Sequence, residues 1–539
     1  MKIRHILFAG LAMLTFSACS TDLNQPPVDQ LASDGFYKTA AQANQGVLGV
    51  YSKLRNLTND EFLLLSEVRS DNMWANPVEN AANEYQSNCM FRSTAESGCF
   101  ESVWNQWYAL IYNANLALQK IPNTTFTDEN IKNQFLGEVH FLRGWAYFEL
   151  ARLYGNVPMI LEPLSVSAAN GVKQTPALEI INNVVIPDLE EALKLPAPDK
   201  IVNATGTAVP EEGRANCVAA QAMLARVYMT LAGFPFNDAS AKAKAKTYLT
   251  QVLANKSKYW APNITEWRKQ WTPDYANKYS IFAIQHRTGG TGNPAIFQFS
   301  RAYPPSFTSI RIFGNALFVE KTLRAEFDKV YSNGEKDQRG EGYSFLDGYE
   351  AEGSAWPLVI PVMEDVTVDG VTTQTNTEAF FYKYIPTKRK LAELGMSLDE
   401  STLKDYYDWP VNFPVLRIED MMLLYAEILA DEGSFDEAMK QVNEIRERAG
   451  CDPVSANDKD TAMKYIQRER RIELMGEGVR WFDEIRYGTW QKDIQNMFDR
   501  YNNPVGTNKE LVSEGRYLCP IPTNQINIVP GLYEQNKGY

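Results

Sequence analysis

Histidine and cysteine are scarce in this chain of 539 residues, which holds three histidines and six cysteines. No two cysteines have the CxxC spacing, and His5 lies in the N-terminal apolar region. Structural zinc sites take their ligands from these two residue types at short spacings. The sequence therefore predicts no metal site. It also has no phosphate-binding glycine loop or nucleophile motif, so we predict no cofactor.

Basic tracts are missing as well. The chain has 53 Lys and Arg against 66 Asp and Glu, a formal net charge of −13. Nucleic acids and anionic membrane surfaces are bound by clustered basic side chains. We therefore predict that neither is the ligand.

No apolar run is long enough to span a bilayer, and the most apolar segment stands at the N-terminus. Lys2 and Arg4 precede apolar residues 6–16, and two small residues then lead to Cys19. This pattern is typical of an export signal, and its end resembles a bacterial lipobox, in which the cysteine is lipidated. A plain signal peptide with an incidental cysteine would share the same charge and length.

The lipobox interpretation predicts a signal peptide over residues 1–18 and a lipidated tether over 19–30. Each buried methylene of an acyl chain contributes ~0.8 kcal/mol to membrane binding, so several chains hold a protein firmly. The polar tether contains Pro26 and Pro27, which favour extended chain. We expect a protein attached to a membrane rather than embedded in it.

Long stretches of the chain have the period of amphipathic helices, among them 104–121 and 137–154. A continuous helical pattern also covers 458–486. The segment 425–445 has the small, large and turn residues of a tetratricopeptide helix pair at the expected spacings, namely Ala426, Leu429, Gly433, Phe435 and Ala438. A similar pair is predicted over 215–254. The fold class is thus mainly α, a tetratricopeptide-like scaffold with long loop-rich insertions and a few short strands.

The middle of the chain, from about 256 to 415, is rich in Pro, Gly, Thr and aromatic residues. Its segment 364–386 alternates like a short hairpin with Asp369-Gly370 as the turn. Long loops on a rigid scaffold are where binding residues usually lie, although these loops could also simply cap the scaffold.

Two further patterns have structural and functional interpretations. Cys89 and Cys99 flank a short Ser- and Gly-containing stretch and could form a local disulfide or remain two free thiols. In 466–486, Arg470 with Glu473 and Arg480 with Asp483 could face one another on a helix. We interpret this charge as a structural network that clamps the helix to its neighbours rather than as catalytic groups.

A family likeness covers the mature chain. It rests on the cysteine at the signal boundary and on segments that stand in order along the sequence: 39–54, 66–74, 104–121, 137–160, 416–433, 442–450, 466–488 and 517–539. Together they resemble the SusD/RagB family of outer-membrane nutrient-binding lipoproteins. The resemblance implies a SusD-like N-terminal helical part over 31–255 and a RagB/SusD C-terminal part over 256–539, packed as one unit.

The resemblance also implies a function and a partner. It predicts a non-enzymatic, cell-surface lipoprotein of the outer membrane that binds oligosaccharides and delivers them to a SusC-like TonB-dependent transporter. A peptide-binding member of the same system is an alternative. Other classes remain open, namely an all-helical surface glycan hydrolase or lyase, and a helical-repeat assembly scaffold.

We expect the ligand-binding residues in loops that hold both aromatic rings and hydrogen-bonding side chains. A sugar offers an apolar face to a ring and hydroxyls to Asp or Asn. Starch-binding relatives place an aromatic arc and an acidic residue in the region matching 68–88, so Asp71 and Trp74 are carried over. The full set of predicted ligand-binding residues is Asp71, Asn72, Trp74, Asn83, Tyr85, Arg287 and Tyr303. His286 is predicted to be a hydrogen-bonded structural residue.

The lipid anchor can be tested directly. We expect mass spectrometry of the mature N-terminal peptide to show Cys19 as the first residue, carrying acyl chains, because the small residues before it mark the cleavage site. A Cys19→Ala variant should appear in the medium or periplasm instead of the membrane fraction. An unmodified Cys19 in a membrane-free protein would contradict the prediction.

Overall fold

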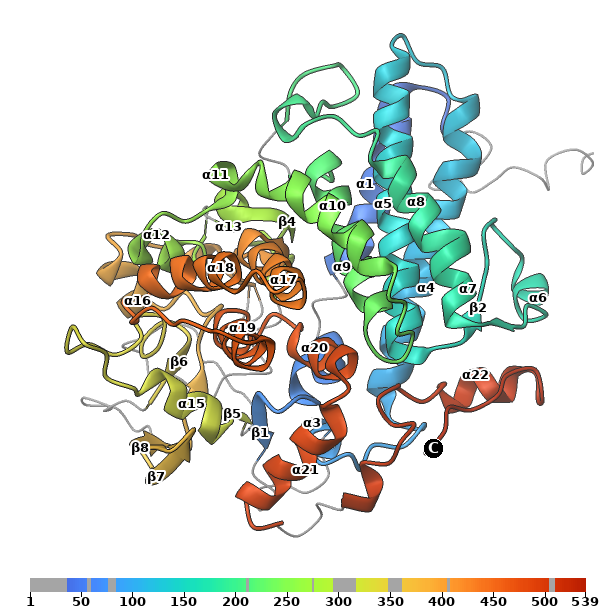
Figure 1. The fold of residues 1–539 in the computed structure, drawn as a ribbon. Coiled ribbons are helices and arrows are strands. Elements are labelled where there is room, and N and C mark those ends of the chain that lie inside the picture. The colour runs from blue at the N-terminus through green and yellow to red at the C-terminus, as the bar shows by residue number, and fades with distance from the viewer. Residues whose placement is uncertain are drawn as a thin grey trace, which may run out of the picture.

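The computed structural model describes residues 36–55, 60–75, 84–209, 213–273, 276–293, 317–347, 361–404, 408–503 and 509–539. Most of its elements are helices (Figure 1). The longer helices are α1 (Ala40–Leu54), α4 (Gly98–Lys120), α5 (Glu129–Tyr154), α9 (Cys217–Ala232), α10 (Ala241–Leu253), α17 (Ile418–Asp431), α18 (Phe435–Arg448), α19 (Lys459–Glu473), α20 (Arg480–Tyr487) and α21 (Trp490–Arg500).

Short helices and strands connect these. The short helices are α2 (Asp60–Leu63), α3 (Glu84–Cys89), α6 (Val166–Ala169), α7 (Ala177–Ile180), α8 (Ile186–Ala192), α11 (Lys256–Tyr259), α12 (Ile264–Lys269), α13 (Ala276–Tyr279), α15 (Lys321–Phe327), α16 (Lys388–Glu393) and α22 (Thr523–Ile528). The strands are β1 (Met73–Ala75), β2 (Val157–Pro158), β3 (Gln174–Thr175), β4 (Ser280–Ile284), β5 (Leu317–Val319), β6 (Phe345–Leu346), β7 (Met363–Val368), β8 (Val371–Asn376), β9 (Phe380–Phe381) and β10 (Phe413–Arg417).

The predicted helix pairs are present, and the mainly α fold class is confirmed. Helices α17 and α18 pack against each other, as do α9 and α10, and α10 also contacts α17 (Figure 1). Ala426 and Ala438 are fully buried, which lets two helices approach closely. Gly433 reverses the chain with a φ of +79°, a conformation that glycine adopts without strain. Helices of the N-terminal half thus pack directly on helices of the C-terminal half.

The long antiparallel helices α4 and α5 pack side by side, with α1 against both of them and α8 along α5 (Figure 1). Asp128 caps the start of α5 by accepting from the N–H of Asn130 at 2.8 Å. Gly155 ends this helix with a positive φ of 73°. Most of α5 is buried, so it forms the centre of the N-terminal half. None of the helices among the described residues is both long and apolar enough to cross a membrane.

The predicted continuous helix over 458–486 is wrong, because the chain turns between α19 and α20. Gly476 and Gly478 adopt φ values of +79° and +71° in this turn. A Cβ atom at Gly476 would lie 2.1 Å from the ring of Phe381, so only glycine fits there. The N–H groups of both glycines donate to the carboxyl group of Glu67, at 2.8 and 3.1 Å. Packing and these tertiary hydrogen bonds override the helical pattern.

The strands form small, separate sheets. The order β1-β5-β9-β6 makes the largest of them among the described residues, and β4 pairs antiparallel with β10. The predicted hairpin is confirmed as β7 and β8, with Val368 opposite Val371. Asp369 and Gly370 have φ values of +53° and +77°, which is the geometry of a two-residue type I′ turn.

Cys89 and Cys99 are free thiols, so of the two alternatives the disulfide is wrong. The sulfur of Cys89 donates to the carbonyl of Met73 at 3.7 Å, and the sulfur of Cys99 accepts from Asn88 Nδ2 at 3.4 Å. Burial raises the pKa of each thiol to about 12. Both behave as small buried side chains that pack against different neighbours.

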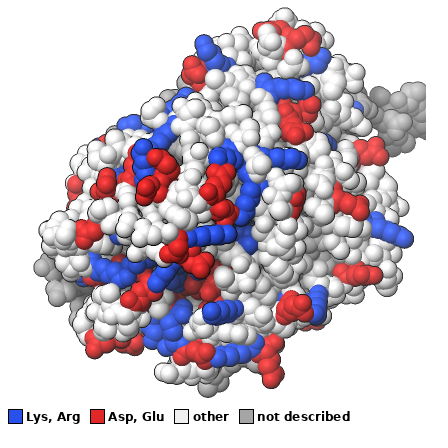
Figure 2. Space-filling model, viewed as in Figure 1, with Lys and Arg blue, Asp and Glu red and all other residues white. Residues whose placement is uncertain are grey.

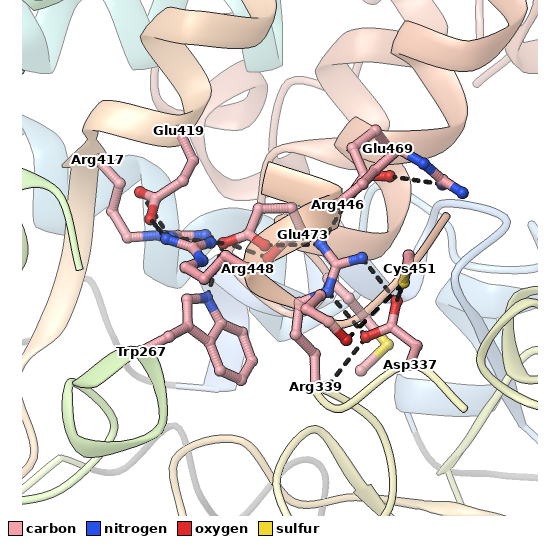
Figure 3. A network of polar contacts seen from close by, with 12 residues as sticks. Trp267, Asp337, Arg339, Arg417, Glu419, Arg446, Arg448, Cys451, Glu469 and Glu473 are labelled. Atoms are coloured by element: carbon pink, nitrogen blue, oxygen red, sulfur yellow. Dashed lines mark hydrogen bonds and ion pairs between the residues drawn. The ribbon is translucent and has the colours of Figure 1, made fainter. Parts of the chain in front are cut away.

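A buried ion network joins the C-terminal helices and strands (Figure 3). Its centre is the carboxyl group of Glu473, which accepts from Arg339 at 2.8 Å, Arg417 at 2.9 Å and Arg448 at 3.0 Å. Trp267 Nε1 also donates to it at 2.8 Å. Burial acts to raise the pKa of Glu473, but the three guanidinium groups hold this pKa well below its usual range.

The structural interpretation of the charged segment 466–486 is therefore supported, although its pairs differ from the expected ones. Arg470 bonds Asp483 at 2.8 Å and Asp420 at 2.8 Å, rather than Glu473. Arg480 bonds Asp71 at 2.7 Å. The side chains reach across helices because α19 and α20 are separate elements.

We expect Glu473→Gln to lower the free energy of unfolding by about 3–5 kcal/mol, because it leaves three buried guanidinium groups without their shared anion. Denaturant unfolding at pH 7 measures this. The contribution of Glu473 is present above its unfolded pKa of about 4.5 and is lost as the pH falls, so the difference between the two proteins should shrink in acid.

The matched control is Glu437→Gln on α18, whose side chain is 64% exposed. It should change the unfolding free energy by less than about 0.5 kcal/mol. Equal effects of the two substitutions would show that the network does not stabilise the fold.

Candidate ligand-binding cleft

The predicted ligand-binding residues are distributed over several parts of the chain. Cys19, Asn83 and Tyr303 lie outside the described residues. Asp71, Asn72 and Trp74 lie at or next to β1, whereas Arg287 follows β4. These two strands are well separated in Figure 1. The structure therefore does not bring the described members of the set together.

Asp71 and Asn72 are buried and engaged in contacts within the protein. Asp71 pairs with Arg480 at 2.7 Å and with Arg471 at 3.3 Å. Burial acts to raise the pKa of the Asp71 carboxyl, but these two guanidinium groups hold it well below its usual range. Asn72 Nδ2 donates to Glu67 at 2.7 Å, and its Oδ1 accepts from Arg471 at 3.0 Å. Both side chains are thus occupied by contacts within the protein, and their role in ligand binding stays a prediction.

Trp74 is also an internal residue. Trp74 is the middle residue of β1, and only 4% of it is exposed. Its ring stacks on the ring of Tyr501, with the two centroids 3.9 Å apart. A sugar needs an open ring face, and Trp74 offers none of useful size. The expectation of an exposed platform here is therefore wrong. Tyr85, on α3, is half-buried and packs against the hydrophobic core.

Arg287 is exposed and lines a cleft of about 980 Å³ that opens beside β4 and β10. The elements around it are α11, α13 and β4, labelled together in Figure 1, with residues of 198–209, 213–216, 398–402 and 410–412. Its polar lining residues are Arg214, Asn216, Lys258, Lys278, Ser280, Gln285, His286, Arg287, Thr288, Asp399, Thr402 and Asn412.

The loop that carries Arg287 is shaped by one carboxylate. Asp408 accepts from the N–H groups of Gly289, Gly290 and Gly292 at 2.6, 2.7 and 2.9 Å, and from the N–H of Lys404 at 3.0 Å. Burial acts to raise the pKa of Asp408, but these donors hold it below its ordinary value. A Cβ atom at Gly292 would lie 2.1 Å from the carbonyl carbon of Asp408, so this close approach requires glycine.

Amide side chains form the floor of the cleft. Asn412 Oδ1 accepts from the N–H of His286 at 2.8 Å, and Asn412 Nδ2 donates to Gln285 Oε1 at 2.9 Å. His286 is 4% exposed, and burial lowers its pKa to about 4. The imidazole is therefore neutral at physiological pH. The expected structural role of His286 agrees with these contacts.

Cations stand on the walls of the cleft. Arg214 bonds the buried carboxyl of Glu138 at 2.8 Å, and Lys278 pairs with Glu266 at 3.0 Å. Lys258 and Arg287 are exposed. A second cavity of about 470 Å³ shares Gly213, Arg214, Ala283 and Gln285 with the first and reaches the end of α1. The lining of the two adjoining cavities therefore extends from α11 to α1, an elongated arrangement.

The described lining residues can hold a polar ligand through hydrogen bonds and charge, and one of them is a carboxylate. Glycoside hydrolysis needs two carboxylates on either side of the bond that breaks. Among the described residues that line both cavities, Asp399 is the only carboxylate. Within the same described part of the chain, no group of His, Cys, Asp and Glu residues is placed to hold a metal ion.

Of the residues in and beside this cleft, the sequence predicts Arg287 as a ligand-binding residue. It does not point to Gln285, Asn412 or Asp408. The only signal for them was the glycine-rich stretch 287–293, which predicts a loop and says nothing about its partners. Asp408 lies 116 to 119 residues away from the three glycine N–H groups that it binds. No local pattern reveals contacts at that separation.

Two family models match the chain. Residues 324–539 match the model described as the SusD family, and residues 29–229 match the model described as "Starch-binding associating with outer membrane". Among curated proteins, SusD-like protein P38 of Formosa agariphila is 26% identical over 509 residues, which cover 90% of this chain and 91% of the relative.

Solved structures share the fold. A SusD superfamily protein from Parabacteroides distasonis superposes with a TM-score of 0.71 at 24% identity and covers 95% of this chain and 100% of its own. A structure described as a laminarin-binding SusD-like protein has a TM-score of 0.67 at 23% identity, with 93% and 100% covered.

The position of Trp74 leads to a stability prediction. We expect Trp74→Ala to lower the free energy of unfolding by about 3–5 kcal/mol, because it removes a buried ring from its stack on Tyr501. The affinity of the folded fraction for ligand should stay unchanged. Denaturant unfolding and calorimetric titration measure the two effects.

The matched control is Tyr112→Ala on α4, since Tyr112 is an aromatic residue that is 50% exposed. It should leave the stability nearly unchanged. Lost ligand affinity at full stability in Trp74→Ala would instead place this ring in the binding site.

Proposed function

Since the chain belongs to the SusD/RagB family, we propose that it is a cell-surface glycan-binding lipoprotein that delivers oligosaccharides to a SusC-like TonB-dependent transporter. The observation that carries the glycan-binding part is the elongated cleft beside β4 and β10, with its floor of amide groups. The match to a model described as starch-binding and the fold shared with a laminarin-binding protein support the same ligand class.

The chemistry of the cleft suits sugar hydroxyls. A hydroxyl both donates and accepts, and Gln285, Asn412 and Thr402 offer both functions in a fixed arrangement. These amides are preformed, because Asn412 donates to Gln285 and accepts from the N–H of His286. A preformed site loses little conformational entropy when it binds. The cleft therefore favours reversible capture of a soluble chain.

Binding, rather than cleavage, is the better match to this lining. A surface glycan hydrolase or lyase would need further groups beside Asp399 to act as acid, base or nucleophile. We accordingly assign the protein the role of capturing the glycan, which other proteins break down. The acyl anchor on Cys19 and the 19–30 tether would keep the cleft at the outer membrane, next to its transporter.

A glycan array followed by calorimetric titration tests the proposal. We expect the mature protein to bind at least one oligosaccharide without releasing products. Gln285→Ala should weaken this binding by about 2–10-fold, the effect of one lost hydrogen bond.

The matched control is Gln106→Ala on α4, outside the cleft, which should bind as the unmodified protein does. Melting temperatures of both variants show whether the fold is kept. Two results would overturn the proposal: no binding to any glycan, or release of shortened products above background.

A further inference from the structure

The charge of the cleft identifies the class of glycan. We propose that its ligand is an acidic oligosaccharide, one that carries uronate carboxylates or sulfate esters. This inference rests on the proposed function and deepens it, because it names the chemistry that selects one class of glycan over neutral ones. Three observations on the described residues carry it: the sign of the lining charge, the cations without anionic partners, and the shortage of exposed rings.

Among the described residues that line the cavities, basic side chains outnumber acidic ones. The larger cavity has four described cations and the smaller adds two more, so the described lining has six cations and one carboxylate, that of Asp399. They are Lys53, Arg55, Arg214, Lys258, Lys278 and Arg287. The whole chain has the opposite balance, with a net charge of −13. On the face shown in Figure 2, basic and acidic side chains are interspersed, which is the ordinary arrangement of a solvated surface.

Only some of these six cations form ion pairs with carboxylates among the described residues. Arg214 and Lys278 have Glu138 and Glu266 as partners. By contrast, Lys53, Lys258 and Arg287 make no ion pair with a carboxylate anywhere in the described part of the chain. Cations gathered in a concave site focus their field there and raise the local concentration of anions.

The two exposed cations of the larger cavity that make no ion pair among the described residues come from different walls. Lys258 lies on α11, and Arg287 lies on the loop that Asp408 holds in place. A guanidinium on a rigid loop can bind a planar carboxylate, or two oxygens of a sulfate, through paired hydrogen bonds. A ligand with anionic groups spaced along a chain would meet Lys258 and Arg287 together.

Neutral sugars are usually gripped by exposed rings, and the described lining offers few of them. In the larger cavity the aromatic residues are Tyr259 and Phe282, which are only 4% and 2% exposed. In the smaller cavity the hydroxyl of Tyr51 is engaged with the N–H of Ala215 at 2.8 Å. Among the described lining residues, ionic and polar groups are therefore the ones available to a ligand, and open ring faces are few.

The test compares matched acidic and neutral ligands on the mature protein. The probes are an oligogalacturonide and its methyl-esterified form, and a sulfated galactan oligosaccharide and its desulfated form. We expect one acidic probe to bind at least about tenfold more tightly than its neutral counterpart, as charged hydrogen bonds allow. This affinity should fall as the salt concentration is raised from about 50 to about 500 mM, because dissolved ions screen exposed charges.

The variant Lys258→Gln/Arg287→Gln should weaken acidic binding by about tenfold or more and reduce its salt dependence. The control Arg389→Gln/Lys440→Gln changes the same residue types outside both cavities, where their side chains are 52% and 71% exposed. It should bind as the unmodified protein does. Melting temperatures of both double variants show whether folding is kept.

The outcomes separate this inference from the function on which it rests. Binding of neutral probes or neutral array glycans alone would overturn the acidic ligand and leave glycan capture standing. Acidic binding that is unchanged in Lys258→Gln/Arg287→Gln would overturn the assignment to this cleft. No binding of any glycan would overturn both proposals.

Discussion

The buried carboxyl group of Glu473 is the contact on which the C-terminal half depends. It pairs with Arg339, Arg417 and Arg448, which come from a loop, the end of β10 and the end of α18. Buried guanidinium groups that have lost their water need such anions, and Asp337, Glu419, Glu469 and Glu477 supply the remaining negative charge. These partners come from distant parts of the chain. Pairing the Glu473 carboxylate with all three arginines therefore also fixes the relative positions of their elements.

That constraint extends to the cleft through β10. Arg417 ends β10 in the ion network, and β10 pairs antiparallel with β4. The loop from Gln285 to Asn293 follows β4, and Asp408, shortly before β10, binds three of its N–H groups. The buried network and the binding loop are thus the two ends of one strand pair. The strand pair therefore connects the rigid scaffold to the loop that carries Arg287.

A protein that captures nutrients must be selective without reacting with what it binds. In the described part of the cleft, hydrogen-bonding side chains and cations are held in fixed positions, while carboxylates are nearly absent. The same chain uses its many carboxylates elsewhere, to neutralise buried arginines. The separation matters physically, because an acidic lining would repel an acidic ligand and a cationic interior would not fold.

The sequence by itself determined the helical scaffold, the helix pair around Gly433, the Asp369-Gly370 turn and the family likeness, because periodicity, small residues and turn glycines act over a few neighbouring positions. Only the tertiary structure decided that Asp71, Asn72 and Trp74 are internal, that the helix breaks at Gly476, and that Arg287 shares a cleft with Gln285 and Asn412. Those outcomes depend on contacts between residues more than a hundred positions apart, such as Asp71 with Arg480 and Gly292 with Asp408. Burial of a given side chain is decided by what packs over it, and no local pattern in the chain records that.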